Sequence, residues 1–399
     1  MRTVTRLLLP AIGLAAAVPA LADCPAANRF SYSWGSATAA TLRYDTSYPY
    51  TATNSLGQNL TFTVSFAVNG TATPNTTVGG IAVPAIATLI TDGTVTNNLV
   101  IGAIFASRTP SITGATRVVA TTLTFPSLVR DLSVQINDID FTTNQFRDWM
   151  YVSGTGASTY VPAIVTPFAT NNGSGAKTSA SSSQALGAAT LPFSQTANES
   201  IGTGASGNNS TTGTLTASFV QPVTAATFRY GNYPLTGTET ASGQQAYGIQ
   251  TVTFCPMPTL TMAKTSTPWS DPQNGTTNPK LIPGGDVIYT LTITNSNASN
   301  LATAELPAIT DLLPSGVTFY NGDIDDAGPL TGNFEFIPGS SGLTLAAGGV
   351  TYSSNAGASY GYTPAAGYDT NVQALRFAPG GSSFLANSSF QIRFRTQVK

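Results

Sequence analysis

The sequence predicts an all-β protein, in which a jelly-roll-like β-sandwich is followed by an immunoglobulin-like β-sandwich. Apolar side chains alternate with polar ones along many short segments, as in residues 60–68, where Phe62, Val64, Phe66 and Val68 share one face. Clusters of Gly, Asn, Ser and Thr separate these segments and are typical of turns and loops. No stretch of residues 23–399 has the apolar spacing of a three-turn amphipathic helix. Many short strands with frequent turns favour sandwiches over parallel α/β sheets.

The domain boundary is predicted from a pair of prolines. Five segments besides 60–68 are predicted strands, namely 117–125, 128–136, 215–220, 223–230 and 248–254. After the last of them, Pro256 and Pro258 form a short, stiff connection, and a new alternating strand begins at Thr259. Since the chain is too long for one compact core, we expect an N-terminal domain over 23–255, a linker over 256–258 and a second domain over 259–399.

The N-terminus has the pattern of a secretory signal. Arg2 and Arg6 precede an apolar run over residues 7–21, which ends in the small residues Ala20 and Ala22. This order of charge, apolar core and small-x-small site predicts a signal peptide over 1–22. The run is shorter than the roughly 20 apolar residues of a membrane-spanning helix, and no later stretch is long and apolar enough. We therefore expect a secreted protein of the cell surface, periplasm or extracellular space, with no transmembrane segment in the mature chain.

The two cysteines stand at the two ends of the predicted N-terminal domain. Cys24 and Cys255 are the whole cysteine content of a chain that we expect to reach an oxidising compartment. An even count in that setting predicts a disulfide between them. Two separate thiols are the alternative.

The charge balance excludes one class of partner. Without Arg2 and Arg6, 14 basic residues face 18 acidic ones, a net charge of −4, and no cluster of Lys or Arg exists. Because binding to nucleic acid requires a basic face, we expect no nucleic-acid partner.

The last third of the chain resembles a known bacterial module. Its three signatures, in order, are residues 260–284 leading into a strand at 287–295, the turn Asp311-Leu-Leu-Pro-Ser-Gly316, and a closing strand at 390–398. Together they are similar to the conserved repeat domain called domain of unknown function eleven, found in secreted and surface proteins. The resemblance implies an immunoglobulin-like sandwich that serves as a spacer or interaction module, and it implies no mechanism. The expected core is Tyr289, Leu291, Ile293, Leu312, Val317, Phe319, Phe377, Phe390, Ile392 and Phe394.

Catalytic chemistry is scarce in this composition. There is no histidine, which removes Ser-His-Asp and Cys-His triads, histidine-bound zinc and the commonest general base. No phosphate-binding or dinucleotide-binding glycine motif is present. The four glutamates, at 199, 239, 305 and 335, are scattered. We therefore expect no enzyme activity, although a glycosidase with two carboxylates brought together by the fold is an alternative.

The densest polar constellation is an acidic turn after the strand at 128–136. Asp138 and Asp140 follow the strand, and Asp148 returns eight residues later. Carboxylate, amide and backbone oxygens are the ligands that calcium prefers, so these three residues are the candidate metal ligands. A solvated turn held by Arg147 and a polar ligand site are the alternatives. We expect that the protein requires no cofactor, and Ca²⁺ is the ion that this turn could bind.

Two functions remain after these exclusions. The first is an exported, non-catalytic structural or adhesive protein of a bacterial envelope or the extracellular space, with an unidentified surface protein or polysaccharide as partner. The second is a calcium-stabilised, lectin-like carbohydrate-binding protein. Tyrosine-rich segments such as the one around Tyr44, Tyr48 and Tyr50 can stack on sugars, but rings that cover the core are the simpler interpretation.

Overall fold

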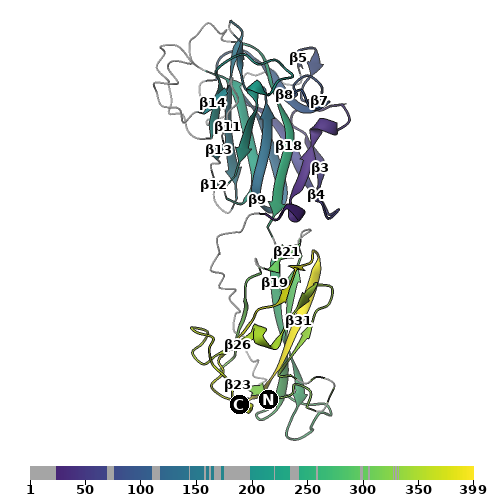
Figure 1. The fold of residues 1–399 in the computed structure, drawn as a ribbon, viewed down its shortest axis with the longest axis vertical. Coiled ribbons are helices and arrows are strands. Elements are labelled where there is room, and N and C mark those ends of the chain that lie inside the picture. Colours follow the sequence, from purple (N-terminus) through teal and green to yellow (C-terminus); the bar gives the residue numbers. More distant parts are fainter. Residues whose placement is uncertain are drawn as a thin grey trace, which may run out of the picture. The chain divides into compact units, whose positions relative to one another are not determined.

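The computed structural model divides into two compact units, Cys24–Met257 and Pro258–Lys399, which are described separately (Figure 1). The described residues are 24–69, 76–109, 117–142, 144–156, 159–160, 163–165, 172–174, 198–219, 221–233, 242–257, 259–296, 300–303, 306–326, 328, 330 and 332–399. The predicted signal peptide over 1–22 lies outside them.

The all-β prediction is confirmed, because both units consist of antiparallel strands and single 3-10 turns. In the N-terminal unit the strands are β1 (Phe30–Ser33), β2 (Ala40–Thr41), β3 (Ser47–Thr53), β4 (Asn59–Asn69), β5 (Thr77–Val78), β6 (Ile81–Ala82), β7 (Ala85–Ala87), β8 (Asn98–Phe105), β9 (Val118–Asn137), β10 (Phe141–Thr142), β11 (Phe146–Thr155), β12 (Thr159–Tyr160), β13 (Ala163–Val165), β14 (Asn172–Ser174), β15 (Glu199–Gly202), β16 (Leu215–Ser218), β17 (Val223–Asn232) and β18 (Gly243–Pro256). The 3-10 turns are Ala26–Asn28, Trp34–Ser36 and Thr211–Gly213. Within the described part of the chain, no helix is long and apolar enough to cross a membrane.

Strand β9 organises the N-terminal unit because its two halves pair with different neighbours. Residues 118–124 pair with β4 and β17, whereas residues 129–137 pair with β18 and, at 133–136, with β16. Val129 also pairs with Val223 of β17. The exchange occurs around Pro126, which has no N–H to donate to a ladder. The path β9–β4–β3–β1–β18–β9 is thereby a closed circuit of paired strands.

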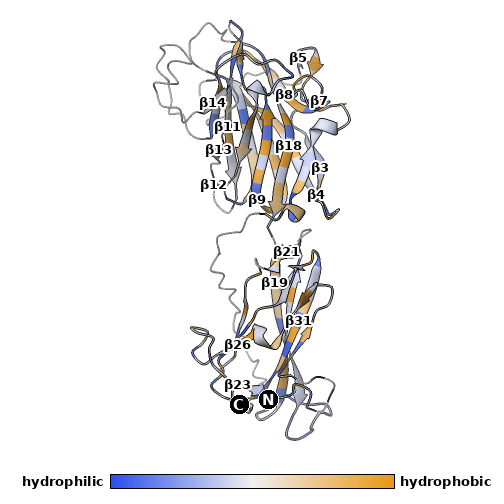
Figure 2. Ribbon diagram, in the orientation of Figure 1, coloured by the Kyte–Doolittle hydropathy of each residue, from blue (hydrophilic) through white to orange (hydrophobic). Residues whose placement is uncertain are grey.

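One core cluster joins this circuit to β8, β11, β16 and β17. Phe62, Val64 and Phe66 of β4 are buried there as their alternation predicts, together with alternate residues of β9 and β18. Hydrophobic residues accordingly recur along β9 and β18 (Figure 2). Tyr44 is buried and Tyr48 and Tyr50 pack against the same core, so these rings cover the core rather than face solvent.

The C-terminal unit contains two main sheets around a second core. One has the order β19 (Leu260–Ser270), β20 (Asp286–Asn295), β31 (Ser388–Val398), β23 (Val317–Asn321), β27 (Gly367–Asp369), with β24 (Phe334–Ile337) also on β31. The other has the order β22 (Ile309–Leu312), β28 (Ala374–Phe377), β26 (Val350–Ser353). Two short pairs are β21 (Leu301–Ala302) with β30 (Ser383–Phe384) and β25 (Leu343–Thr344) with β29 (Gly380–Gly381), and Ala347–Gly349 is a 3-10 turn.

Nine of the ten predicted core residues of this unit are buried in that core, and Leu312 is the exception. The Leu312 side chain is 51% exposed, so its assignment to the core was wrong. Strand β22 alternates with Ile309 and Asp311 inward, which turns Leu312 to the outside. The inward position of β22 is therefore occupied by the carboxylate of Asp311, and not by the neighbouring Leu312 that was predicted to lie in the core.

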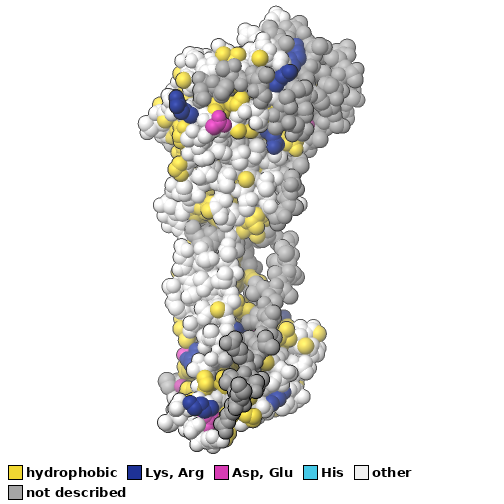
Figure 3. All heavy atoms as spheres, turned by 180° about the vertical axis from the view of Figure 1, so that it is seen from behind, with side chains coloured by type: hydrophobic (Ala, Val, Ile, Leu, Met, Phe, Trp, Pro, Cys, Tyr) yellow, Lys and Arg dark blue, Asp and Glu magenta, His cyan; other side chains and the backbone are white. Residues whose placement is uncertain are grey.

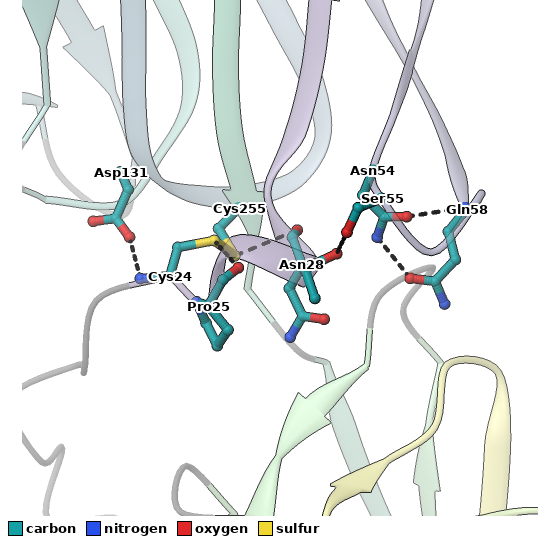
Figure 4. Close-up of a disulfide and its surroundings, with 9 residues drawn as sticks. Cys24, Pro25, Asn28, Asn54, Ser55, Gln58, Asp131 and Cys255 are labelled. Atoms are coloured by element: carbon teal, nitrogen blue, oxygen red, sulfur yellow. Dashed lines mark hydrogen bonds between the residues drawn. A yellow bond between two sulfur atoms is a disulfide. The ribbon is translucent and has the colours of Figure 1, made fainter.

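The predicted disulfide between Cys24 and Cys255 is present. Figure 4 shows it at the end of the unit, where the Cys24 backbone N–H also donates to Asp131 Oδ2 at 2.8 Å. Both cysteines are buried, and Cys255 lies in β18 opposite Arg130 of β9. The bridge spans 231 residues and so closes the whole N-terminal unit into one loop.

Removal of this disulfide should lower the stability of the N-terminal unit without affecting the other unit. In the chain-entropy model a loop of this size stabilises by about 5 kcal/mol, less any strain in the folded state. Calorimetry of the Cys24→Ser/Cys255→Ser variant should therefore show a lower unfolding temperature for the N-terminal unit. The transition of the C-terminal unit, which contains no cysteine, serves as the internal control. An unchanged N-terminal transition would contradict the expected stabilisation.

Candidate functional site

A cavity of about 450 Å³ opens in the N-terminal unit beside the end of β9. Its walls come from five parts of the chain, namely β5, the segment before β8, the β9–β11 connection, the β15–β16 connection and the start of β18. The described lining residues are Val78, Gly79, Leu89, Ile90, Asp138, Asn144, Gln145, Phe146, Asn208, Ser242, Gly243, Gln244, Gln245 and Ala246. Apolar side chains and amides thus share the wall with one carboxyl group.

Asp138 brings that carboxyl group to the cavity. It directly follows β9, and its residue is only 9% exposed. Its Oδ1 atom is buried and has no hydrogen-bond partner among the described residues. Asp138 and Asn144, which both line the cavity, have φ angles of 69° and 62°. Such left-handed conformations are uncommon outside glycine, although Asn and Asp tolerate them best, and they often occur at functional sites.

Gln245 supplies the second unsatisfied group. It lies in β18 opposite Ala103 of β8, lines the cavity and is 1% exposed. Neither its Oε1 nor its Nε2 has a partner within the described ranges. Leaving a buried polar group unpaired costs about 1–3 kcal/mol, and most such groups in native proteins have a partner. Since Asp138 Oδ1 and these two Gln245 atoms have almost no accessible surface, a molecule in the cavity would reach them only through a change of side-chain conformation.

The other two predicted metal ligands are close to Asp138 and hold hydrogen bonds, although Asp140 Oδ1, like Asp138 Oδ1, is buried and has no partner among the described residues. Asp148 is fully buried, accepts the Tyr230 O–H through Oδ1 and accepts the Asp140 N–H through Oδ2 at 3.2 Å. Asp140 Oδ2 accepts the Ser206 N–H at 2.5 Å. Neither Asp140 nor Asp148 is among the residues that line the cavity.

Burial raises the pKa of all three carboxyl groups. The pKa of Asp138 rises to about 8 through burial and then through the nearby Asp140. Burial raises the pKa of Asp140 to about 6, against the opposing hydrogen bond from Ser206. The pKa of Asp148 lies well above its usual value, through burial and the charge of Asp140. At neutral pH Asp138 is therefore protonated and can both donate and accept a hydrogen bond.

The fold thus brings the three acids together without forming an evident metal centre. Among the described residues, no group of three or more Asp, Glu, Cys or His side chains could hold a metal ion as arranged. Arg147 donates to the Gly202 carbonyl at 2.7 Å and lies 4.0 Å over the Phe141 ring. Calcium binding by Asp138, Asp140 and Asp148 stays a prediction.

The sequence predicted the acidic turn of this site but not Gln245. The acidic turn was recognised from its density of carboxylates, but Gln245 was not, because the strand was predicted to begin at Gly248 rather than Gly243. Two consecutive glutamines, Gln244 and Gln245, shortly before the predicted strand at 248–254 were the available signal. One of any two neighbours in a strand faces inward, so a Gln-Gln pair there places an amide in the interior.

No protein-family model matches the chain, and no curated protein resembles it at a significant level. The site is therefore interpreted from its own geometry.

The raised pKa values predict a specific dependence of stability on pH. In the unfolded chain the pKa of an aspartate is about 3.9, whereas that of Asp138 in the folded state is about 8. Between these two pH values the folded state therefore binds more protons than the unfolded state. The stabilisation is full at low pH and is lost as the pH rises toward 8. Calorimetry in the presence of a chelator should show the N-terminal unit melting at lower temperature as the pH increases from about 5 to about 9.

The Asp138→Asn variant should show a shallower pH dependence, because asparagine does not titrate. Asp45→Asn, at an exposed aspartate of the same unit that also has positive φ, is the matched control and should leave the slope unchanged. A melting temperature that is flat over this pH range would mean that Asp138 is not buried in its protonated form.

Proposed function

We propose that this chain is an exported, non-catalytic adhesive protein of a bacterial envelope or the extracellular space, and that the cavity at Asp138 and Gln245 binds a carbohydrate. The observation that carries the proposal is the pair of buried, unsatisfied polar side chains at a cavity wall. It favours the lectin-like alternative as the way in which adhesion is achieved.

The chemistry of the wall fits a sugar. A sugar hydroxyl both donates and accepts, and so do the amide of Gln245 and the protonated carboxyl of Asp138. Leu89, Ile90 and Phe146 offer apolar surface for the C–H faces of the ring. The volume of about 450 Å³ lies within the usual range for small-molecule sites.

The presence of a single acidic side chain in the described lining of the cavity favours binding without catalysis. A glycosidase places two carboxyl groups on either side of the bond that it cleaves. Asp138 is the one acidic residue in the described lining, while Asp140 and Asp148 are turned to Ser206 and Tyr230. A binding site needs no such pair.

Export is supported by three features. Residues 1–22 have the pattern of a secretory signal, and the Cys24–Cys255 disulfide suits an oxidising compartment. Charged residues are few, and on the face seen in Figure 3 most described surface atoms belong to the backbone or to uncharged polar side chains. We propose that the C-terminal unit, which resembles a repeat domain of surface proteins, is a spacer or a second interaction module.

Glycan binding tests this proposal directly. Purified protein applied to a glycan array should retain a defined set of sugars, and Gln245→Leu should weaken the binding by about tenfold or more, because two hydrogen bonds of about 0.5–1.5 kcal/mol each are lost. Asp45→Asn is again the control and should bind as the parent does. The same glycans should be recovered uncleaved after incubation. Retention of no glycan would refute the carbohydrate site, and cleavage abolished by Asp138→Asn would make the protein an enzyme.

Calcium can be tested separately. We expect millimolar calcium to raise the melting temperature of the N-terminal unit, since a ligand that binds the folded state alone stabilises it by about 2.7 kcal/mol at a hundredfold excess over Kd. The Asp138→Ala/Asp140→Ala variant should lose this response. Identical melting in calcium and in chelator would leave the three acids as hydrogen-bonding groups only.

A further inference from the structure

The C-terminal unit contains a lysine at a position where its strand faces the core. Along β19, Leu260, Met262 and Lys264 alternate with exposed residues, and the first two pack against the core. The side chain of Lys264 is only 3% exposed. Since a lysine is rarely buried without a partner, this position calls for an explanation.

The partner of Lys264 comes from the other main sheet of the unit. Asp311 lies in β22 and points inward with a fully buried side chain. The Lys264 Nζ atom lies 2.8 Å from Asp311 Oδ1 and 2.7 Å from Oδ2. No other hydrogen bond of either side chain is found in the described part of the chain, so the amine and the carboxyl group face each other alone.

Aromatic rings enclose the pair. The Nζ atom lies 4.3 Å from the ring centroid of Tyr289 and 5.8 Å from that of Phe394. These two rings belong to β20 and β31 and are themselves 5.6 Å apart. The pair thus lies between two sheets with almost no exposed surface, without the hydrogen-bonding surroundings that stabilise buried ions elsewhere.

This environment shifts both groups toward their uncharged forms. Burial lowers the pKa of Lys264, and burial raises the pKa of Asp311, although each charge opposes the shift of the other. One proton transferred from the ammonium to the carboxylate gives a neutral amine in contact with a carboxylic acid.

We propose that Lys264 and Asp311 condense into an intramolecular amide bond that joins β19 covalently to β22. The neutral Nζ atom attacks the Asp311 carboxyl carbon, the C–N bond forms, the C–OH bond breaks, and the hydroxyl group leaves as water with a proton from the nitrogen. The net change is an ammonium and a carboxylate giving an amide and one water, so no oxidant, reductant or co-reactant is needed.

Proximity and burial both assist this reaction. Well-oriented intramolecular reactions reach effective molarities of about 10⁵–10⁸ M, and here the two groups are within hydrogen-bond distance before any reaction. Condensation also replaces two charges in an apolar compartment with one neutral amide, which removes the cost of burying them. The rings of Tyr289 and Phe394 limit the access of the water that would hydrolyse the product.

Peptide mapping of the full, folded chain tests the bond. After unfolding, reduction and digestion with trypsin, the peptide with Lys264 should be joined to the peptide with Asp311, with a mass one water below their sum. Trypsin should cleave after the exposed Lys280 but not after Lys264, whose amine would no longer be free. Recovery of the two peptides separately and unmodified would show an ion pair only and would overturn the proposal, as would a water loss at another position.

Matched variants sharpen the test. Lys264→Arg keeps the cation beside Asp311 but cannot form this amide, so both of its peptides should have unmodified masses. Asp311→Asn should still form the link, with the loss of one ammonia instead of one water. Lys280→Arg, at an exposed lysine, should retain the link fully. A water loss that persists in Lys264→Arg would contradict the assignment.

Discussion

The N-terminal unit depends on the hydrogen bonding of a single strand, β9, to four neighbouring strands. Backbone groups inside a protein must find partners, and β9 satisfies its own by pairing with β4 before Pro126, with β18 and β16 after it, and with β17 on both sides. Both described features of the unit are placed by this strand. Asp138 follows its last residue, and Cys255 lies opposite Arg130 near its middle.

Much of the fold follows from the sequence, because apolar side chains at every second position of a strand indicate the face that is buried. Phe62, Val64 and Phe66 are core residues as predicted, and so are Tyr289, Leu291 and Ile293. The misjudged points are boundaries. Residues 117–125 and 128–136 were predicted as two strands around Pro126, whereas one bent strand runs from Val118 to Asn137. Pro126 indicates the end of a strand, because proline cannot donate to a ladder. The sequence does not show that β9 continues beyond it and pairs there with β18 and β16.

The polar interior was harder to predict, since an inward polar residue breaks the alternation on which the prediction relies. Leu312 was assigned to the core because it is apolar, and the neighbouring Asp311 was attributed to the turn. Lys264 stands in phase with Leu260 and Met262, but nothing in the sequence indicates the residue that will face it 47 positions later. Gln245 and Asp138 present the same difficulty, because they lie 107 residues apart and meet at the cavity only through the pairing of β18 with β8 and β9.

The disulfide gives the N-terminal unit a property that its strands alone would not have. Cys24 and Cys255 are the first and nearly the last residues of the unit Cys24–Met257. A pulling force applied to the two ends of this unit would therefore pass through the sulfur–sulfur bond and would leave the hydrogen-bonded ladders of β9 and β18 unloaded. Pulled between these two ends, the unit would keep its fold until that covalent bond was broken.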